Sequence, residues 1–129
     1  MRILVVDDDD LVRELTVVVL QRAGYHVVPA SNASEALELA GSGPIDLVVS
    51  DVVMPGLTGV DLLTELRRRR PDLPVILMTG GSPEPERTAM ALELGASAIV
   101  FKPYTHAELR DAVSAALSDQ PRSRSPAGS

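Results

Sequence analysis

The chain has 129 residues, of which 45% are hydrophobic but only 2% aromatic, so it fits one compact domain with an aliphatic core. A formal net charge of −6 argues against general nucleic-acid binding, and the lack of cysteine excludes a disulfide framework and a thiolate metal site. Because no apolar run is long enough to span a membrane and the amino terminus does not resemble a signal peptide, we expect a cytoplasmic protein.

A short apolar run, Ile3 to Val6, leads directly into four aspartates, residues 7–10. An unalternated, β-branched run is typical of a strand buried on both faces in a parallel sheet. The aspartates mark the carboxyl end of that strand, where open α/β sheets bind their ligands. Since adjacent carboxylates repel unless a cation is supplied, Asp7 and Asp8 indicate a hard divalent ion such as Mg²⁺. The other two aspartates are better explained as caps of the next helix.

The residues after the aspartates predict a helix and then an edge strand. A helix of about four turns, ended by Gly24, is indicated by apolar residues at helical spacing: Leu11, Leu15, Val18 and Val19. A short strand over 26–28 follows, and Pro29 suits an edge strand because such strands need fewer backbone donors. Asn32 and Glu35 have capping-box spacing and begin a second helix.

Three more strands and three more helices alternate along the rest of the chain. The strands are apolar runs that end on a polar residue, at Asp51, Thr79 and Lys102. The first of the helices covers about residues 59–69, the second ends at about Leu94 and the third ends at about Leu117. We expect a single domain over residues 1–118. The segment 119–129 is rich in Ser, Pro, Arg and Gly, and we expect a flexible tail.

Five strands alternating with five helices predict a parallel sheet with right-handed crossovers. The strand ends of such a sheet emerge at one edge, so residues far apart in sequence converge there: Asp7, Asp8, Asp51, Thr79 and Lys102. Three carboxylates can hold a metal, while a hydroxyl and an ammonium group can bind the oxygens of a phosphoryl group. Asp51 is the expected acceptor, because the acidic pair on the neighbouring strand can hold the metal.

Lys102 is the only lysine among the 12 basic residues of the chain. An ammonium group on a flexible stem binds a small buried anion differently from the planar fork of arginine. We therefore interpret this lysine, at a strand end, as a functional residue.

The chain resembles the receiver domain of two-component response regulators. It is close in size to the single-domain chemotaxis type and is also similar to receivers of hybrid histidine kinases. The resemblance covers about residues 2–117 and rests on five motifs in order: Val5-Val6-Asp7-Asp8, Asp51-Val52-Val53-Met54-Pro55-Gly56, Thr58-Gly59, Met78-Thr79-Gly80 and Phe101-Lys102-Pro103. It implies a flavodoxin-like, doubly wound sheet of five parallel strands in the order 2-1-3-4-5, with five helices.

The resemblance also implies the chemistry. Asp51 would accept a phosphoryl group from a phosphohistidine on a sensor histidine kinase or phosphotransfer protein, in a reaction that depends on Mg²⁺ or Mn²⁺. The metal ligands would be three carboxylates and one backbone carbonyl: those of Asp7 (through water), Asp8 and Asp51, and that of Val53. Thr79 and Lys102 would contact phosphoryl oxygens, and the Lys102–Pro103 bond would be cis. A downstream protein would bind the face formed by the fourth helix, last strand and last helix.

The sequence departs from the family at the usual switch position, three residues before the lysine, where an aromatic residue is replaced by Ile99. We expect a muted switch, in which Thr79 moves against Ile99 with smaller amplitude or a different aromatic residue reports the state. Phe101 and Tyr104 are the candidates, although packing is the simpler role for both.

Three functions are weighed. The first is a phosphoaccepting signalling domain that is not an enzyme for external substrates, and the presence of all five site residues favours it. The second is a receiver-fold interaction module that is never phosphorylated. The third is a Mg²⁺-dependent phosphohydrolase, but dehalogenase-type phosphatases have a second aspartate where this chain has Val53. In the family that the chain resembles, the residues two positions after the acceptor and two after the threonine tune hydrolysis of the aspartyl phosphate, and here these are Val53 and Gly81. Because neither can hydrogen-bond an attacking water through its side chain, we expect a long-lived phosphoryl state. We expect no direct DNA binding and no membrane contact.

Overall fold

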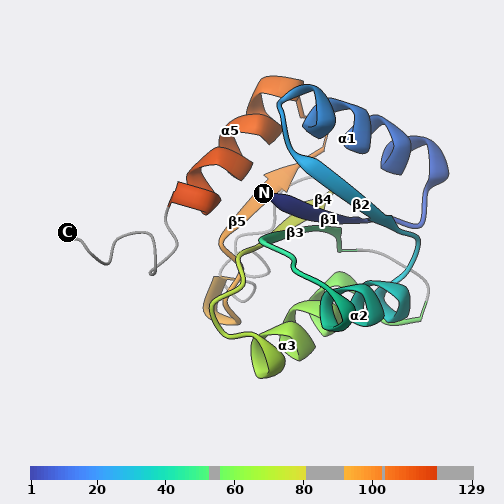
Figure 1. Ribbon diagram of the computed structural model, residues 1–129, viewed down its shortest axis with the longest axis vertical. Helices are drawn as coiled ribbons and strands as arrows, with labels where there is room; N and C mark the ends of the chain where they lie inside the picture. The colour runs from blue at the N-terminus through green and yellow to red at the C-terminus, as the bar shows by residue number, and fades with distance from the viewer. Residues whose placement is uncertain (53–55, 81–91, 103, 119–129) are drawn as a thin grey trace.

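The structure is a computed structural model that describes residues 1–52, 56–80, 92–102 and 104–118 (Figure 1). Within these residues, five parallel strands form one sheet in the order β2-β1-β3-β4-β5. The predicted strand order and the edge position of β2 are therefore confirmed. The strands are β1 (Arg2–Val6), β2 (His26–Ala30), β3 (Leu47–Asp51), β4 (Val75–Thr79) and β5 (Ala98–Phe101).

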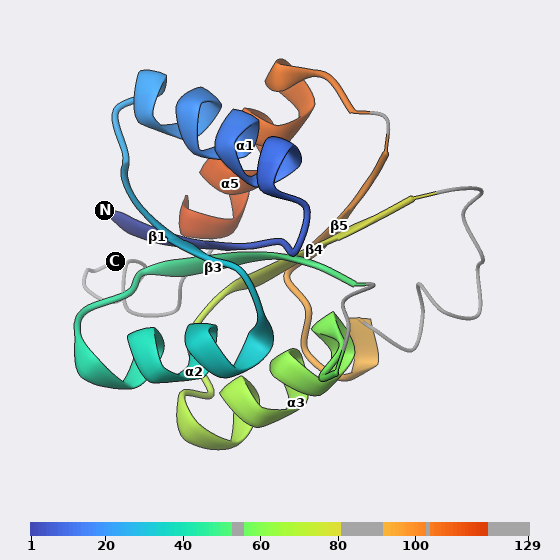
Figure 2. The same cartoon turned by 90° about the vertical axis from the view of Figure 1, so that its right-hand side faces the viewer.

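Of the helices that the structure describes, two lie on each face of the sheet (Figure 2). Helices α1 (Asp10–Arg22) and α5 (His106–Ser118) lie on one face, and α2 (Ala33–Ser42) and α3 (Gly59–Arg69) lie on the other. Alternate strand residues enter opposite cores: Leu4 and Val6 pack on the α2/α3 side, whereas Ile3 and Val5 pack on the α1/α5 side. Both cores are apolar, which explains why the central strands are continuous hydrophobic runs.

Helix α1 begins where the sequence predicts, and the structure shows which of its residues are buried. Asp9 is the N-cap, and its side chain accepts a hydrogen bond from the Val12 amide. The buried residues are Thr16 and Leu20. Of the apolar residues that predicted the helix, three are exposed, Leu11 by 65%, Leu15 by 55% and Val18 by 42%, whereas Val19 is half-buried against the α1/α5 core. The predicted helix is therefore confirmed, but apolar residues at helical spacing did not indicate which of its sides packs against the sheet.

Side chains also cap the starts of other helices. In α3, Thr58 and Asp61 form a reciprocal capping box, and Thr105 and Glu108 make the same pair of bonds at α5. Strand β2 continues through Pro29 to Ala30 instead of stopping before the proline, which an edge strand tolerates. The predicted fourth helix, ending near Leu94, falls mostly on residues outside the described ranges.

The predicted tail, 119–129, also lies outside the described residues, so the domain boundary after residue 118 stays a prediction. None of the helices in the described ranges has both the length and the apolar character needed to cross a membrane.

Candidate functional site

An acidic cluster lies at the carboxyl edge of the sheet, where β1 and β3 end side by side. Val6 pairs with Ser50 in the sheet register, so the residues that follow them, Asp7 and Asp51, lie on neighbouring strands. Asp7 is fully buried and Asp51 is 8% exposed, whereas Asp8 is exposed. One carboxylate oxygen from each of the three residues lies within 4.8 Å of the others. The three aspartates together could therefore hold a metal ion.

Asp7 gives the clearest sign that the cluster suits a cation. Its Oδ1 accepts a hydrogen bond of 2.9 Å from the Asp9 amide. No hydrogen-bond donor reaches its buried Oδ2 from the residues that the structure describes. Burial is the main cause that raises the pKa of the Asp7 carboxyl above 3.8, and the nearby Asp51 charge acts in the same direction. A buried carboxylate oxygen without a donor fits a hard divalent cation.

Lys102, the residue after β5, brings a positive charge to this cluster. Its Nζ lies 3.4 Å from Asp51 Oδ2 and 3.8 Å from Asp7 Oδ2, and its side chain is 27% exposed. The Lys102 amide donates to the Thr79 carbonyl at 2.7 Å, which joins β5 to the end of β4. The ammonium is thus close enough to both carboxylates to stabilise their charge and remains accessible to an incoming anion.

The two predicted switch residues lie on neighbouring strands. Thr79 is the last residue of β4, where it is half-buried and pairs with Phe101. Its hydroxyl lies 3.5 Å from the Gly80 carbonyl. Ile99 is half-buried and packs against the α2/α3 core. Their assignment as a switch stays a prediction.

Three residues with predicted roles fall outside the described ranges: Val53, Gly81 and Pro103. The metal-binding carbonyl, the control of hydrolysis and the cis peptide bond therefore also stay predictions.

Sequence reasoning gave no structural role to Gly59, although Thr58-Gly59 was part of the resemblance. Gly59 begins α3 directly against the end of β3, and its amide donates to the Val52 carbonyl at 2.8 Å. A Cβ at this position would collide with the Asp51 carbonyl oxygen. Gly59 therefore allows the start of α3 to lie against the backbone of the predicted phosphoacceptor.

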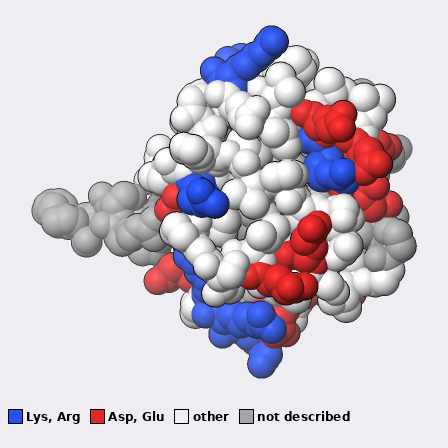
Figure 3. All heavy atoms as spheres, turned by 45° about the vertical axis from the view of Figure 1, so that its right-hand side comes forward, with Lys and Arg blue, Asp and Glu red and all other residues white. Residues whose placement is uncertain are grey.

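The basic run at the end of α3 has local structural partners. Arg68 and Arg69 form ion pairs with Glu65 at 3.2 Å and 2.9 Å, and Arg70 donates to the Ile45 carbonyl. On the face that Figure 3 shows, basic side chains form separate groups, most of which have acidic side chains beside them. That face offers no continuous basic surface of the kind that binds nucleic acid.

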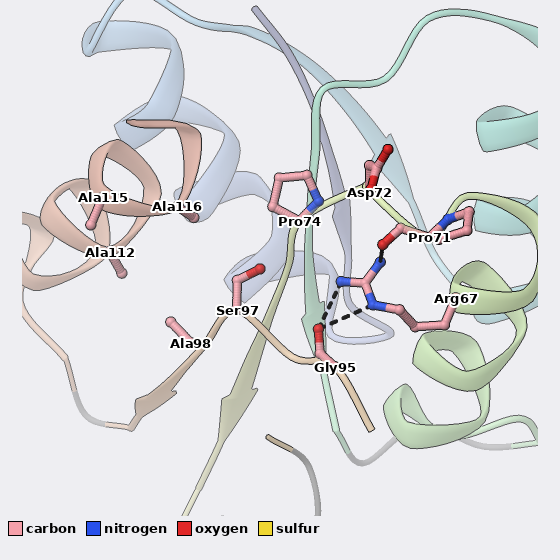
Figure 4. A pocket seen from close by; sticks show the side chains of 10 residues that line it. All are labelled: Arg67, Pro71, Asp72, Pro74, Gly95, Ser97, Ala98, Ala112, Ala115 and Ala116. Carbon is pink, nitrogen blue, oxygen red and sulfur yellow. Dashed lines mark hydrogen bonds between the residues drawn. The ribbon is translucent and has the colours of Figure 1, made fainter. Parts of the chain in front are cut away.

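A cavity of about 450 Å³ lies at the opposite, amino-terminal edge of β4 and β5 (Figure 4). The Arg67 guanidinium on its wall donates to the Gly95 carbonyl at 3.1 Å and 2.7 Å, and to the Pro71 carbonyl at 3.2 Å. Burial lowers the pKa of Arg67. Since backbone carbonyls take most of its donors, we interpret Arg67 as a clamp between the end of α3 and the turn before β5.

A sequence profile described as the response regulator receiver domain matches residues 3–114. The chain belongs to this family. The matched range contains the acidic cluster, Thr79 and Lys102. Receiver domains of this family act in signalling and partner with sensor kinases.

Curated relatives of this receiver include longer regulators. The alkaline phosphatase synthesis transcriptional regulatory protein PhoP of Bacillus subtilis (strain 168) is 36% identical over 116 residues, which cover 90% of this chain and 48% of PhoP. The DNA-binding transcriptional regulator NtrC of Rhizobium meliloti (strain 1021) is 40% identical over 124 residues, covering 93% of this chain and 25% of NtrC. The receiver spans about half the length of PhoP and a quarter of NtrC.

Solved structures agree with the fold along nearly their whole length. The receiver domain of NtrX from Brucella abortus superimposes with a TM-score of 0.86 at 31% identity, covering 92% of this chain and 99% of that one. The chemotaxis protein CheY4 of Vibrio cholerae gives a TM-score of 0.85 at 29% identity, covering 90% and 98%. The predicted flavodoxin-like receiver fold is confirmed.

Proposed function

We propose that this receiver accepts a phosphoryl group on Asp51 from a phosphohistidine of a sensor histidine kinase or phosphotransfer protein. The proposal rests on the 3.4 Å distance between Lys102 Nζ and Asp51 Oδ2, beside a cluster of three carboxylates. An Asp51 oxygen attacks phosphorus, the phosphorus–nitrogen bond to the donor imidazole breaks, and its electron pair stays on that nitrogen. The Lys102 ammonium stabilises negative charge on the phosphoryl oxygens.

Asp7, Asp8 and Asp51 would hold Mg²⁺ or Mn²⁺, together with the Val53 carbonyl. Two features support the fit: the three carboxylate oxygens within 4.8 Å of one another, and the buried Asp7 Oδ2 that lacks a hydrogen-bond donor in the described part of the chain. The bound metal would supply positive charge against the carboxylates and the transferred group. Thr79 would donate its hydroxyl to a phosphoryl oxygen.

The proposed output is a change in partner binding and not turnover of an external substrate. The receiver would bind a downstream protein through the face that contains β5 and α5, and would act in the cytoplasm with its kinase. The names of PhoP and NtrC describe transcriptional regulators. The expectation that this chain itself does not bind DNA stays a prediction.

An alternative is a receiver-fold interaction module that is never phosphorylated. The phosphoaccepting function is favoured by the position of Lys102 between two carboxylates, one of which, Asp7, is fully buried. Burying a charged group is costly, and an interaction module would have no need of one at this position.

The test is incubation with acetyl phosphate and Mg²⁺, followed by intact-mass spectrometry. We expect one added phosphoryl group, which is lost on treatment with hydroxylamine and absent in Asp51→Asn. Asp111→Asn, an exposed carboxylate on α5, is the matched control and should react like the wild type. Mg²⁺ binding without phosphorylation, by either acetyl phosphate or a phosphorylated kinase domain, would contradict the proposal and favour the interaction module.

A further inference from the structure

Tyr104 lies in the link between β5 and α5, two residues after Lys102. Its ring is half-buried and packs against the core on the α1/α5 face. Ile99, at the usual switch position, packs against the other core. Tyr104 is therefore an aromatic residue with a hydroxyl group near the site, on the opposite side of the sheet from the usual switch position.

The Tyr104 hydroxyl meets two other elements of the fold. Its oxygen lies 3.3 Å from Thr16 Oγ1 on α1 and 3.3 Å from Met78 Sδ on β4. Thr16 is only 3% exposed, and its own hydroxyl donates to the Val12 carbonyl at 2.8 Å. Since that bond uses the Thr16 proton, Thr16 Oγ1 accepts a hydrogen bond from the Tyr104 hydroxyl, for which the thioether of Met78 is the weaker acceptor. The hydroxyl pair thus ties the β5–α5 link to α1.

The position of the Lys102 ammonium depends on how the backbone around it is held. Both of its Nζ–carboxylate distances, 3.4 Å and 3.8 Å, exceed the roughly 2.7–2.9 Å of a charge-assisted hydrogen bond, so these contacts do not fix the ammonium. On one side, the Lys102 amide is held by the Thr79 carbonyl at 2.7 Å. On the other side, the next contact that holds the described chain in place is the hydrogen bond between the Tyr104 hydroxyl and Thr16.

We infer that Tyr104, through its hydrogen bond to Thr16, is a positioning residue for Lys102. The bond holds the link after β5 so that the ammonium stays beside Asp51, and it connects that site to the buried side of α1. The inference rests on the proposed function, in which Lys102 contacts the phosphoryl group.

The test uses the fact that Lys102 is the only lysine of the chain. Protein labelled with ¹³C-lysine gives a single Lys Cε signal in an NMR spectrum. The spectrum would be measured without metal for four proteins: the wild type, Tyr104→Phe, Thr16→Val and the double variant. Each single variant should move the signal in the same direction. The double variant should move it no further than the larger single change, because both remove one shared bond.

The same variants should slow phosphorylation by acetyl phosphate. We expect about a 2- to 10-fold decrease in rate, the range that loss of one neutral hydrogen bond corresponds to. Thr16→Ser keeps the hydroxyl and should restore both the rate and the Lys102 signal. A Thr16→Ser signal displaced as far as that of Thr16→Val would show that the effect comes from packing at position 16 and not from the hydroxyl, and would overturn the inference.

The chain offers a matched control for each substitution. Thr64 on α3 bonds its i−4 carbonyl at 2.9 Å, as Thr16 does, so Thr64→Val tests loss of that bond alone. Tyr25 packs against the same core from the start of β2, at the other edge of the sheet, so Tyr25→Phe tests loss of a phenol hydroxyl away from the site. Neither control should move the Lys102 signal.

Two results separate this inference from the proposed function. If Tyr104→Phe and Thr16→Val lower the unfolding temperature but leave the Lys102 signal unchanged, the hydroxyl pair serves packing and the inference is wrong, whatever the phosphorylation rate. If the signal moves as expected but the wild type is not phosphorylated, the positioning of Lys102 stands and the proposed function fails.

Discussion

Gly59 lies directly against Asp51, and a Cβ on Gly59 would collide with the Asp51 carbonyl oxygen. The contact joins the first residue of α3 to the last residue of β3. Helix α3 can start this close to the strand only because its first residue has no side chain. The position of the predicted phosphoacceptor thus depends on a residue that has no functional group.

Gly59→Ala should destabilise the receiver by about 1–3 kcal/mol, the usual cost of adding a methyl group to a packed site. It should also slow phosphorylation of Asp51, because α3 must move away from the β3 end. Urea unfolding and the acetyl phosphate reaction measure the two effects. Gly41→Ala, in α2 with open space around its Cβ, is the control and should stabilise the protein by about 0.5–1 kcal/mol. Equal effects from both substitutions would show that the Gly59 contact is unimportant.

Asp7→Asn should stabilise the metal-free receiver at neutral pH. The pKa of Asp7 is raised in the folded state, mainly by burial, so folding favours its protonated form. Stability of the wild type therefore falls as pH rises from the ordinary carboxyl value of 3.8 through the raised pKa, and Asn removes this loss. Unfolding temperatures measured in EDTA across this range should diverge with rising pH. A constant difference between the two proteins would contradict the prediction.

The same variant should lose its stabilisation by Mg²⁺. A ligand present at 100 times its Kd stabilises the folded state by about 2.7 kcal/mol, so a clear rise in the wild-type unfolding temperature is expected. Asp72→Asn, an exposed carboxylate outside the cluster, should keep that rise. If Asp7→Asn is stabilised by Mg²⁺ as much as the wild type, Asp7 does not contribute to metal binding.

Lys102→Met should separate metal binding from phosphoryl transfer. Removing the ammonium leaves the nearby carboxylates without their competing cation, so Mg²⁺ should bind more tightly. Phosphorylation should nevertheless slow by about 100-fold, the typical effect of removing one group that stabilises transition-state charge. Calorimetric titration with Mg²⁺ and the acetyl phosphate rate measure the two effects. Arg68→Met, at the exposed end of α3, should change neither.

Arg67→Met should lower stability without affecting the site. It leaves partly buried carbonyls, including that of Gly95, without their donor, at a cost of about 1–3 kcal/mol. Mg²⁺ affinity should stay at the wild-type value, since the clamp lies at the opposite edge of the sheet. Arg68→Met should cost less than about 0.5 kcal/mol, because exposed ion pairs contribute little. A similar loss of unfolding free energy in both variants would contradict the role of Arg67 as a clamp.

Much of the fold could be predicted because four of the five strands are apolar runs that lead into a polar residue. The convergence of Asp7, Asp51 and Lys102 follows from one rule, that parallel strands end at the same edge. The packed face of α1 could not be predicted, because Leu11 and Leu15 are as apolar as the buried Leu20.

The supporting contacts of the site were also beyond sequence reasoning. The bond between Tyr104 and Thr16 joins residues 88 positions apart, and no local pattern indicates it. The contact of Gly59 with Asp51 depends on how closely a helix approaches a strand, which spacing does not describe. Residue type and order thus predicted the groups at the site, whereas the tertiary structure shows what holds them.

The position of Tyr104 also makes it an intrinsic fluorescent probe of the site. The chain contains no tryptophan and only two tyrosines, so Tyr25 and Tyr104 provide nearly all of its near-ultraviolet signal. Tyr25→Phe leaves Tyr104 as the single phenol, with its oxygen 3.3 Å from Met78 Sδ and its backbone two residues from Lys102. Tyrosine emission from that variant would follow events at the phosphoryl site in real time, without any attached dye.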